Sequence, residues 1–89
     1  MRHELKSWPS FFEPILQGVK TFEIRENDRK FSTGDEIWLR EWCTEKKYSG
    51  RSLEARISYI FDTPMLGLEK GYICFSLLNI KRLGDTKGG

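Results

Sequence analysis

The densest group of polar side chains in the sequence lies between residues 18 and 29, and its residue types suit nucleic-acid binding or proton transfer. An arginine binds a phosphate or a purine edge with parallel hydrogen bonds, and a carboxylate accepts hydrogen bonds from the amino groups of bases. A lysine next to a carboxylate can act as an acid–base pair when burial shifts their pKa values. The members of this group are Lys20, Glu23, Arg25, Asn27, Asp28 and Arg29.

The spacing of Glu23 and Arg25 allows two interpretations. Two residues apart on a strand, their side chains share one face of the strand and lie about 7 Å apart. They can form a surface ion pair, with Lys20 favouring the end of the preceding helix, at a gain of well under ~1 kcal/mol. Alternatively, they form one wall of a binding cleft. Spacing alone does not decide between the two.

A second candidate site is the run Trp38, Arg40 and Trp42, in which every second residue is aromatic or cationic. Bases stack on aromatic rings, and a neighbouring arginine contacts phosphate or stacks in turn. The alternative is that a barrel buries both faces of this strand, so that the two tryptophans belong to the core. Trp8 presents a similar choice, between the mouth of a cleft and a hydrophobic staple on the helix that follows.

Several other kinds of site are not predicted. His3 stands on a short segment that we expect at a sheet edge, where we interpret it as solvated and not as a general base. Gly67 and Gly71 have turn spacing, and no phosphate-binding G-K-[ST] follows them. Cys43 and Cys74 lie far apart without a C-x-x-C pair, which predicts reduced thiols and no zinc site, although one bridge between them stays open. We expect no metal and no cofactor.

Size, composition and charge restrict the class of protein. A chain of 89 residues that is 38% hydrophobic, 13% aromatic and 31% charged has room for one core and too much apolar mass for wholesale disorder. The net charge of +2 is too small to establish a nucleic-acid partner by itself. No run of about 18 apolar residues and no signal peptide is visible, so we expect a cytoplasmic protein, and we expect it to be monomeric.

The elements that must position these residues are one early helix and several short strands. Ser10 and Glu13 have the spacing of a capping box, which places the helix start near Pro9 or Ser10. Gly18 has the position of a helix stop, and Pro14, which lacks an amide donor, is tolerated best near a helix start. Alternation of apolar and polar residues predicts strands at 2–6, 21–25, 36–42, 53–61 and 72–83.

The same alternation predicts the faces of these strands. Phe22 and Ile24 form the apolar side of their strand, and Glu23 and Arg25 point together to the other side. Residues 43–51 are polar and predict a long hairpin turn, and residues 62–71 predict a loop or one helical turn. The apolar positions that share a strand face, together with Phe31, which is predicted to return to the core, are Phe31, Ile37, Leu39, Leu53, Ala55, Ile57, Tyr59, Ile73, Phe75 and Leu77.

Together these elements predict a mainly β (α+β) fold, in which the strands form a small barrel and the helix caps one opening. One domain covers residues 1–83. Residues 84–89 have nothing to bury and are expected to be a disordered tail.

The segment Gly18-x-Lys20-x-x-Glu23-x-Arg25 resembles the G-x-K-x-x-E-x-R signature of ASCH domains, which belong to the PUA-like superfamily. The resemblance runs from about residue 5 to residue 83, nearly the whole chain. It is closest to an uncharacterised, compact ASCH-related family of bacterial and phage proteins to which RNA binding is ascribed. The flanking elements that carry it are Leu5-Lys6-x-Trp8-Pro9, Phe12, Phe22-Glu23-Ile24-Arg25-x-Asn27-Asp28-Arg29, Gly34-Asp35, Tyr48-x-Gly50-Arg51 and Gly67-Leu68-x-x-Gly71-Tyr72.

The resemblance implies a PUA-like β-barrel with a helix over a cleft, and RNA or a nucleotide as the partner. Some ASCH proteins remove the acetyl group from acetylated cytidine, with a lysine that Lys20 matches and a threonine where this chain has Glu23. Their later glutamate has Glu69 as its candidate here. We therefore expect a non-catalytic binding module, with an amidohydrolase that uses Lys20 and Glu23 as the alternative. By analogy, the residues in and around the cleft are Lys6, Trp8, Lys20, Glu23, Arg25, Asn27 and Arg29.

Overall fold

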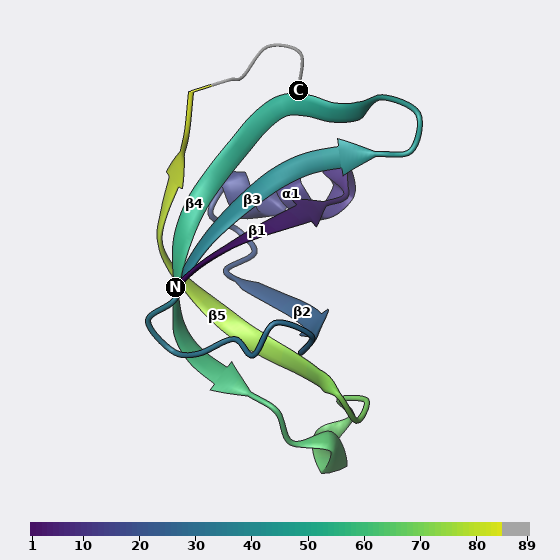
Figure 1. The fold of residues 1–89 in the computed structure, drawn as a ribbon, viewed down its shortest axis with the longest axis vertical. Helices are drawn as coiled ribbons and strands as arrows, with labels where there is room; N and C mark the ends of the chain where they lie inside the picture. Colours follow the sequence, from purple (N-terminus) through teal and green to yellow (C-terminus); the bar gives the residue numbers. More distant parts are fainter. Residues whose placement is uncertain (85–89) are drawn as a thin grey trace.

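Five strands form a single, strongly curled sheet in the computed structural model, which describes residues 1–84 (Figure 1). A short α-helix follows the first strand, and a 3-10 turn, Pro64–Leu66, precedes the last strand. The predicted mainly β fold with one early helix is confirmed. Apart from Gly84, the predicted disordered tail lies outside the described residues. The elements in chain order are β1 (Arg2–Ser7), α1 (Pro9–Leu16), β2 (Phe22–Glu26), β3 (Glu36–Cys43), β4 (Lys47–Phe61) and β5 (Tyr72–Arg82).

The sheet has the strand order β1-β3-β4-β5-β2, so β1 and β2 occupy its two edges. β1 runs parallel to β3, and the other neighbouring pairs are antiparallel. The sheet curls into a half-barrel, and α1 makes the connection between the two edge strands (Figure 1). Because β1 and β2 are not neighbours in the strand order, a seam remains between them where a closed barrel would have none.

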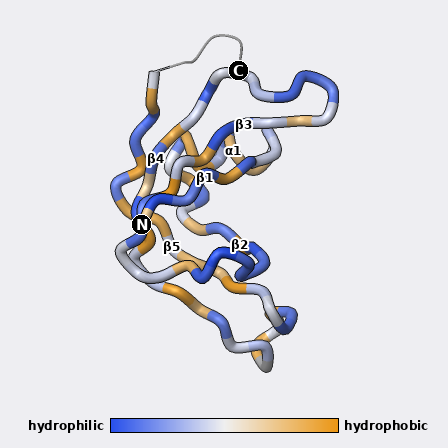
Figure 2. The backbone as a smooth tube through the Cα atoms, in the orientation of Figure 1, coloured by the Kyte–Doolittle hydropathy of each residue, from blue (hydrophilic) through white to orange (hydrophobic). Residues whose placement is uncertain are grey.

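The hydrophobic core lies inside the curl of the sheet, where alternate residues of the strands meet. Figure 2 shows hydrophobic and hydrophilic stretches interleaved along the strands, as this alternation requires. Phe31, in the long connection between β2 and β3, is 7% exposed and packs against Phe75 with the ring centroids 5.2 Å apart. Its predicted return to the core is confirmed. The buried apolar residues are Leu5, Phe12, Ile15, Phe31, Ile37, Leu39, Leu53, Ala55, Ile57, Ile73, Phe75 and Leu77.

The ends of α1 lie close to their predicted places, but the helix is capped differently. The N-cap residue is Trp8, whose side chain makes no capping hydrogen bond. The predicted capping box of Ser10 and Glu13 does not form, because Trp8 is the N-cap and Ser10 already lies inside the helix. The Glu13 carboxylate accepts a hydrogen bond from Gln17 at 2.7 Å instead. Gly18 adopts φ 78°, the left-handed conformation in which glycine commonly ends a helix.

The β3–β4 hairpin is tighter than predicted, because β4 already begins at Lys47. The prediction of a long turn over residues 43–51 is wrong, and residues 48–51 belong to the strand. Their polar side chains do not break it: Ser49 Oγ and Arg51 Nε both donate to Glu41 Oε1 of β3, at 2.6 and 3.0 Å. Gly50 absorbs the local irregularity with φ 97°.

Two side chains lie on the side opposite to the predicted one. Tyr59 was expected to share a face with Ile57, but it is 69% exposed because the β4–β5 register shifts between these residues. His3 is 5% exposed instead of solvated, and its Nε2 lies 2.8 Å from Oδ2 of Asp35. β1 is an edge strand as predicted, but the side chains of an edge strand still alternate between core and solvent.

Candidate functional site

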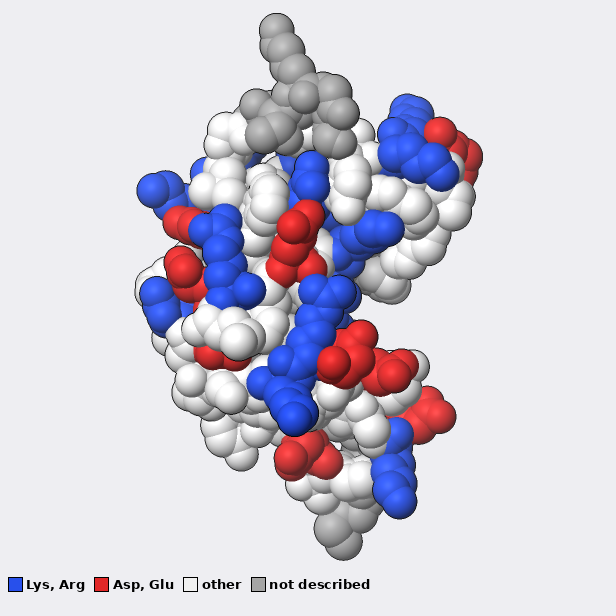
Figure 3. All heavy atoms as spheres, viewed as in Figure 1, with Lys and Arg blue, Asp and Glu red and all other residues white. Residues whose placement is uncertain are grey.

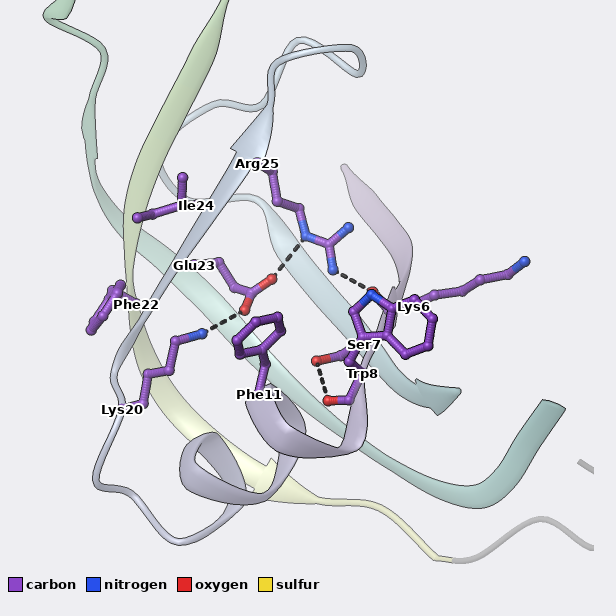
Figure 4. Close-up of a pocket in the computed structure, with 9 residues that line it drawn as sticks. All are labelled: Lys6, Ser7, Trp8, Phe11, Lys20, Phe22, Glu23, Ile24 and Arg25. Atoms are coloured by element: carbon purple, nitrogen blue, oxygen red, sulfur yellow. Dashed lines mark hydrogen bonds and ion pairs between the residues drawn. The ribbon is translucent and has the colours of Figure 1, made fainter. Parts of the chain in front are cut away.

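A groove with a volume of about 410 Å³ lies at the seam between the two sheet edges. Three parts of the chain build it: the end of β1, the first turn of α1, and β2 with the residues before it (Figure 4). α1 has only eight residues, so the chain returns quickly from one sheet edge to the other. Figure 3 shows the hollowed outline on the right of the molecule. The lining residues are Lys6, Ser7, Trp8, Phe11, Lys20, Phe22, Glu23, Ile24 and Arg25.

The carboxylate of Glu23 lies at the base of the groove, and the residue is 5% exposed. Its Oε1 accepts a hydrogen bond from Lys20 Nζ at 3.1 Å, and its Oε2 accepts one from Arg25 Nε at 2.8 Å (Figure 4). A buried carboxylate needs such partners, because the loss of hydration costs several kcal/mol. Glu23 and Arg25 are therefore not a surface ion pair, and that interpretation of their spacing is wrong.

β2 turns its charged side inward and its apolar side outward, opposite to the arrangement typical of a half-buried strand. Glu23 stands opposite the core residue Phe75 of β5, so both side chains point to the concave face. Phe22 and Ile24 consequently point outward and are 41% and 55% exposed. The inversion is tolerated because two cations satisfy the buried carboxylate at the open seam. Periodicity predicts the alternation correctly, but not which side faces inward.

Arg25 also bridges the seam, because its Nη2 donates a hydrogen bond to the main-chain oxygen of Lys6 on β1. Two residues earlier on β1, the main-chain oxygen of Glu4 accepts a hydrogen bond from Arg29 Nη1. The backbone groups of alternate residues point to the same side of a strand, and the carbonyl of Met1 bonds to β3. The carbonyls of Glu4 and Lys6 therefore face the free edge, where two arginines cover them.

The free edge of β2 contributes main-chain groups to the seam. The oxygen of Thr21 accepts a hydrogen bond from β5, and the nitrogen of Asn27 donates one to the carbonyl that precedes β5. By alternation, the odd-numbered residues between them bond to β5. The N–H and C=O groups of Phe22, Ile24 and Glu26 therefore point away from β5 and toward the seam. These groups can bind a polar ligand without help from a side chain.

Aromatic rings form the walls of the groove. Trp8 is 47% exposed, and Phe11, about one turn later, is 51% exposed. The Nζ of Lys20 lies 5.2 Å from the ring centroid of Phe11 and 5.1 Å from that of Phe22. Of the two places considered for Trp8, the structure shows the groove mouth, where its ring meets Trp42 edge-on at 5.6 Å. The groove therefore combines flat apolar surfaces with fixed charges.

The structure brings five of the seven predicted site residues into the groove and separates two from it. Asn27 Oδ1 accepts a hydrogen bond from the main-chain nitrogen of Phe31 at 3.2 Å, so it shapes the loop that returns Phe31 to the core. Arg29 lines an adjoining hollow of about 470 Å³ together with Glu4, Leu5, Lys6 and Tyr48. The five predicted residues that line the groove are Lys6, Trp8, Lys20, Glu23 and Arg25.

Four lining residues were missed by reasoning from the sequence, namely Ser7, Phe11, Phe22 and Ile24. Phe11 carried a usable signal. Its neighbour Phe12 belongs to the core stripe of the helix, and adjacent helical residues point about 100° apart, so Phe11 had to leave the core. Phe22 and Ile24 gave no such signal, because an apolar pair on a strand normally marks the core side.

Arg51 on β4 fixes the helix that carries the two ring walls. Its Nη2 lies 2.7 Å from Glu13 Oε1 of α1 and 2.9 Å from Glu41 Oε2 of β3. The hydrogen bond from Arg51 lowers the pKa of the Glu41 carboxyl, although burial acts in the opposite direction. Hydrogen bonds from Gln17 and then Arg51 lower the pKa of Glu13. The two acids in turn raise the pKa of Arg51, Glu41 more than Glu13.

Cys43 and Cys74 are free thiols, so the bridge between them does not form. Within residues 1–84, no group of three His, Cys, Asp or Glu side chains is placed to hold a metal ion. The same part of the chain contains no helix long and apolar enough to cross a membrane. Among the lining residues of the groove, the acid is Glu23 and the cations are Lys6, Lys20 and Arg25.

A family model described as a domain of unknown function, DUF3850, matches residues 2–77 of the chain. The chain belongs to the DUF3850 family. The matched residues include every residue that lines the groove.

A protein of Escherichia phage P2, described as an uncharacterized 12.9 kDa protein in the GpA 3′ region, is similar to this DUF3850 domain. The two are 38% identical over 60 residues, which make up 67% of this chain and 54% of the phage protein. The chain therefore spans about half the length of the curated relative that it matches.

Proposed function

We propose that this DUF3850 domain binds RNA or a nucleotide in the groove and does not catalyse a reaction. The observation that carries the proposal is the buried carboxylate of Glu23, held by Lys20 and Arg25 between aromatic walls. A nucleotide presents matching parts: a flat base, donor and acceptor groups on its edges, and a phosphate. Trp8 and Phe11 offer surface for the base, and the three charged residues bind its polar groups.

Glu23 and Arg25 keep hydrogen-bonding capacity for a ligand. An ionised carboxylate has about four lone-pair sites, and the described part of the chain places one side-chain donor on each oxygen of Glu23. Arg25 uses Nε for Glu23 and Nη2 for Lys6, so its Nη1 makes no hydrogen bond within the described residues. A base amino group can therefore donate to Glu23 while Arg25 meets a phosphate or a base acceptor.

The charge of the groove favours an anionic ligand, although the whole chain is only mildly basic. Lys6, Lys20 and Arg25 stand against Glu23, which gives three positive charges minus one negative charge, or +2. The net charge of the whole protein is also +2. The net positive charge of the groove therefore equals that of the whole protein. A cleft with a net charge of one sign attracts ions of the opposite sign.

The resemblance of residues 18–25 to the ASCH signature supports the same proposal. Its three polar positions are Lys20, Glu23 and Arg25, the residues that form the ion-paired group at the base of the groove. Under this proposal the half-barrel is a PUA-like domain, and the signature is its recognition site.

Fluorescence anisotropy of labelled single-stranded RNA at low salt tests the proposal. Glu23→Gln removes the negative charge of the carboxylate, and Arg25→Lys removes the forked set of guanidinium donors, each with little change in size. Each is expected to weaken binding about tenfold, because a charge-assisted hydrogen bond contributes about 1.5–3 kcal/mol. Lys70→Ala, at an exposed lysine outside the groove, is the matched control and should leave the affinity within about twofold. Absence of binding to any oligomer, or binding that ignores both groove variants, contradicts the proposal.

The contact of 3.1 Å between Lys20 and Glu23 favours one second candidate function. A lysine and a buried carboxylate can exchange a proton. An amidohydrolase acting on acetylated cytidine would add water across the amide, break its C–N bond and release acetate and cytidine. Glu69, the candidate for a further catalytic glutamate, does not line the groove. Acetate release by the unmodified protein and not by Lys20→Ala would establish this function, and no acetate release would exclude it.

A further inference from the structure

The outer face of the sheet carries alternating aromatic and cationic side chains beside the groove. β3 explains their placement: Ile37, Leu39 and Glu41 are buried on the inner side, so Trp38, Arg40 and Trp42, which alternate with them, point outward. Neighbouring strands add Arg2, Lys6 and Tyr48 to the same face, because paired residues on adjacent strands share a side of the sheet. Lys47 is paired with Cys43 instead, but its Nζ lies 5.7 Å from the ring centroid of Trp42. Seven residues form this aromatic–cationic stripe: Arg2, Lys6, Trp38, Arg40, Trp42, Lys47 and Tyr48.

Each ring of the stripe lies next to a cation. The guanidinium carbon of Arg40 lies 3.8 Å from the ring centroid of Tyr48 and 4.8 Å from that of Trp38. The Nζ of Lys6 lies 4.5 Å from the ring centroid of Trp42 and 6.0 Å from that of Tyr48. Such contacts hold the long cationic side chains along the ring faces. The stripe is therefore a continuous surface on which charges and flat rings alternate.

The three rings of the stripe are half-buried, so they are neither core residues nor fully exposed. This answers the question that the sequence left open for Trp38 and Trp42. The Nε1 of Trp38 is buried and has no hydrogen-bond partner among the described residues. A buried donor without an acceptor costs free energy.

The stripe is continuous with the groove. Trp8 of the groove contacts Trp42 of the stripe, and Lys6 belongs to both. The hollow of about 470 Å³ that adjoins the groove is lined by Lys6, Arg29 and Tyr48, among others. Figure 3 shows Lys and Arg side chains, with Asp and Glu side chains among them, in a band down the middle of one face beside the hollowed outline. A ligand that leaves the groove at its Trp8 end therefore meets the stripe.

We propose that the stripe binds the nucleotides that flank the one held in the groove, so that the ligand is a single-stranded nucleic acid chain and not a mononucleotide. This inference rests on the proposed function of the groove. Phosphates attract the cations of the stripe, and a cation drawn away from a ring uncovers a face on which a base stacks. The nucleic acid must be single-stranded, because the bases of a duplex stack on one another and do not reach an aromatic side chain of the protein.

The dimensions and charge of the stripe fit a chain of nucleotides. Trp38 and Trp42 are four residues apart on β3, which is about 13 Å at roughly 3.3 Å per residue and leaves room for more than one base. Arg2, Lys6, Arg40 and Lys47 supply the positive charge. Three acids of the same face oppose it in part: Glu36 is paired with Arg2, and Glu4 and Glu54 are both paired with Trp38. The Oε2 of Glu4 accepts a hydrogen bond from Arg40 Nη1 at 2.9 Å and holds that guanidinium in place.

The dependence of affinity on ligand length is the direct test. A labelled single-stranded octanucleotide is titrated by fluorescence anisotropy, as RNA and as DNA in separate arms, and a mononucleotide is used as the competitor. The octanucleotide is expected to bind at least tenfold more tightly than the mononucleotide, because base stacking on aromatic side chains and phosphate contacts add along the chain. Tighter binding of the RNA or of the DNA octanucleotide identifies the natural source of the strand.

Variants separate the stripe from the groove. Trp38→Leu is expected to weaken octanucleotide binding about fivefold or more, the effect of one lost stacking contact. Lys47→Gln is expected to reduce the slope of log affinity against log salt by about 0.7, the value for one phosphate contact on a single strand. Neither change should alter mononucleotide binding, whereas Glu23→Gln should weaken both ligands. Lys47 is exposed, so its variant keeps the test independent of any folding defect in Trp38→Leu.

The outcomes distinguish this inference from the proposed function of the groove. If the octanucleotide binds no more tightly than the mononucleotide, the proposal that the stripe binds flanking nucleotides is wrong, and the proposal for the groove is unaffected. The stripe is also overturned if both stripe variants bind the octanucleotide like the unmodified protein. If neither ligand binds, both proposals fail.

Discussion

Arg25 on β2 donates a hydrogen bond to the main-chain carbonyl of Lys6 on β1, across the seam that the sheet leaves open. The same guanidinium donates to the buried carboxylate of Glu23 at 2.8 Å. One side chain therefore spans the seam and also compensates a buried charge. Arg29 makes a similar bridge to the carbonyl of Glu4, but its carboxylate neighbour Asp28 is exposed. The two arginines thus allow these two roles to be measured separately.

Arg25→Ala is expected to lower the free energy of unfolding by about 2–3 kcal/mol, because it leaves the buried carboxylate of Glu23 with Lys20 as its cation. Urea unfolding followed by tryptophan fluorescence measures the effect. Arg29→Ala is the matched control and should cost about 1 kcal/mol or less, since it removes a carbonyl contact at an exposed side chain. Equal losses in the two variants would contradict the role assigned to Arg25.

Glu23→Gln and Glu26→Gln compare two acids on the same strand, one buried in the groove and one exposed. The change at Glu23 is expected to weaken RNA binding about tenfold, because an amide is a weaker acceptor than a carboxylate and frees the two cations from their fixed positions. The change at Glu26 should leave the affinity within about twofold. Anisotropy titrations of both variants check this, and a loss at Glu26 as large as at Glu23 would rule against base recognition by Glu23.

Arg51→Ala is expected to lower the free energy of unfolding by about 2 kcal/mol, because Glu41, which is 7% exposed, loses its charged partner. Glu13→Ala removes only the half-buried carboxylate of the same cluster and should lower the free energy of unfolding clearly less. Urea unfolding of the two variants measures the difference. The Arg51 variant should also bind RNA more weakly, since α1 then holds Trp8 and Phe11 less firmly. An unchanged RNA affinity would show that the contacts of Arg51 do not affect binding in the groove.

Acid is expected to destabilise the protein through Asp35 and Glu41. The hydrogen bond from His3 lowers the pKa of Asp35 from its ordinary value of 3.8, and that from Arg51 lowers the pKa of Glu41 from 4.5. A carboxyl whose pKa is lower in the folded state stabilises the fold above its ordinary pKa and loses this contribution as the pH falls through the folded value. The free energy of unfolding should therefore stay level from pH 7 to about pH 5 and decrease below about pH 4.

The double variant Asp35→Asn, Glu41→Gln provides the control for this acid dependence. It should be less stable than the unmodified protein at pH 7, and its free energy of unfolding should change less between pH 7 and about pH 3. An equally steep decrease in the double variant would assign the acid sensitivity to other carboxyl groups.

Glu4→Gln is expected to tighten octanucleotide binding about twofold, because it removes the negative charge that opposes the cations of the stripe and frees Arg40. Binding of a mononucleotide in the groove should not change. Anisotropy titrations of both ligands at two salt concentrations measure the effect. A weaker octanucleotide complex would show that Glu4 serves the stripe by positioning Arg40 rather than by opposing it.

The parts of the fold that the sequence predicted well are those where one physical signal acts alone. Ile37 and Leu39 on β3, and Ile73 and Phe75 on β5, alternate with polar residues and are buried, because hydrophobic burial alone sets their face. Gly18 stops α1, because few residues adopt its positive φ. In the candidate site, the spacing of Glu23 and Arg25 placed both on one face of their strand, and the resemblance to the ASCH signature assigned them to a cleft together with Lys20.

The remaining features depend on partners that are distant in the sequence. Glu23 faces inward only because the seam lies beside it, and the position of the seam follows from the strand order. His3 is buried because Asp35, 32 residues later, accepts its hydrogen bond. The polar residues 48–51 continue β4 because Glu41 satisfies two of them. Local periodicity carries no information about such pairs, so His3 was assigned to the wrong face and residues 48–51 to the wrong element, and periodicity did not say which face of β2 points inward.

The seam between β1 and β2 also determines how the domain can change shape when a ligand binds. In a closed barrel, widening the space between two strands breaks a ladder of main-chain hydrogen bonds. Here two arginine side chains, Arg25 and Arg29, bridge the two edge strands, and each donates one hydrogen bond to a main-chain carbonyl of β1. The gap can therefore adjust to ligands of different thickness by the swing of side chains, while all strand pairings in the sheet stay intact.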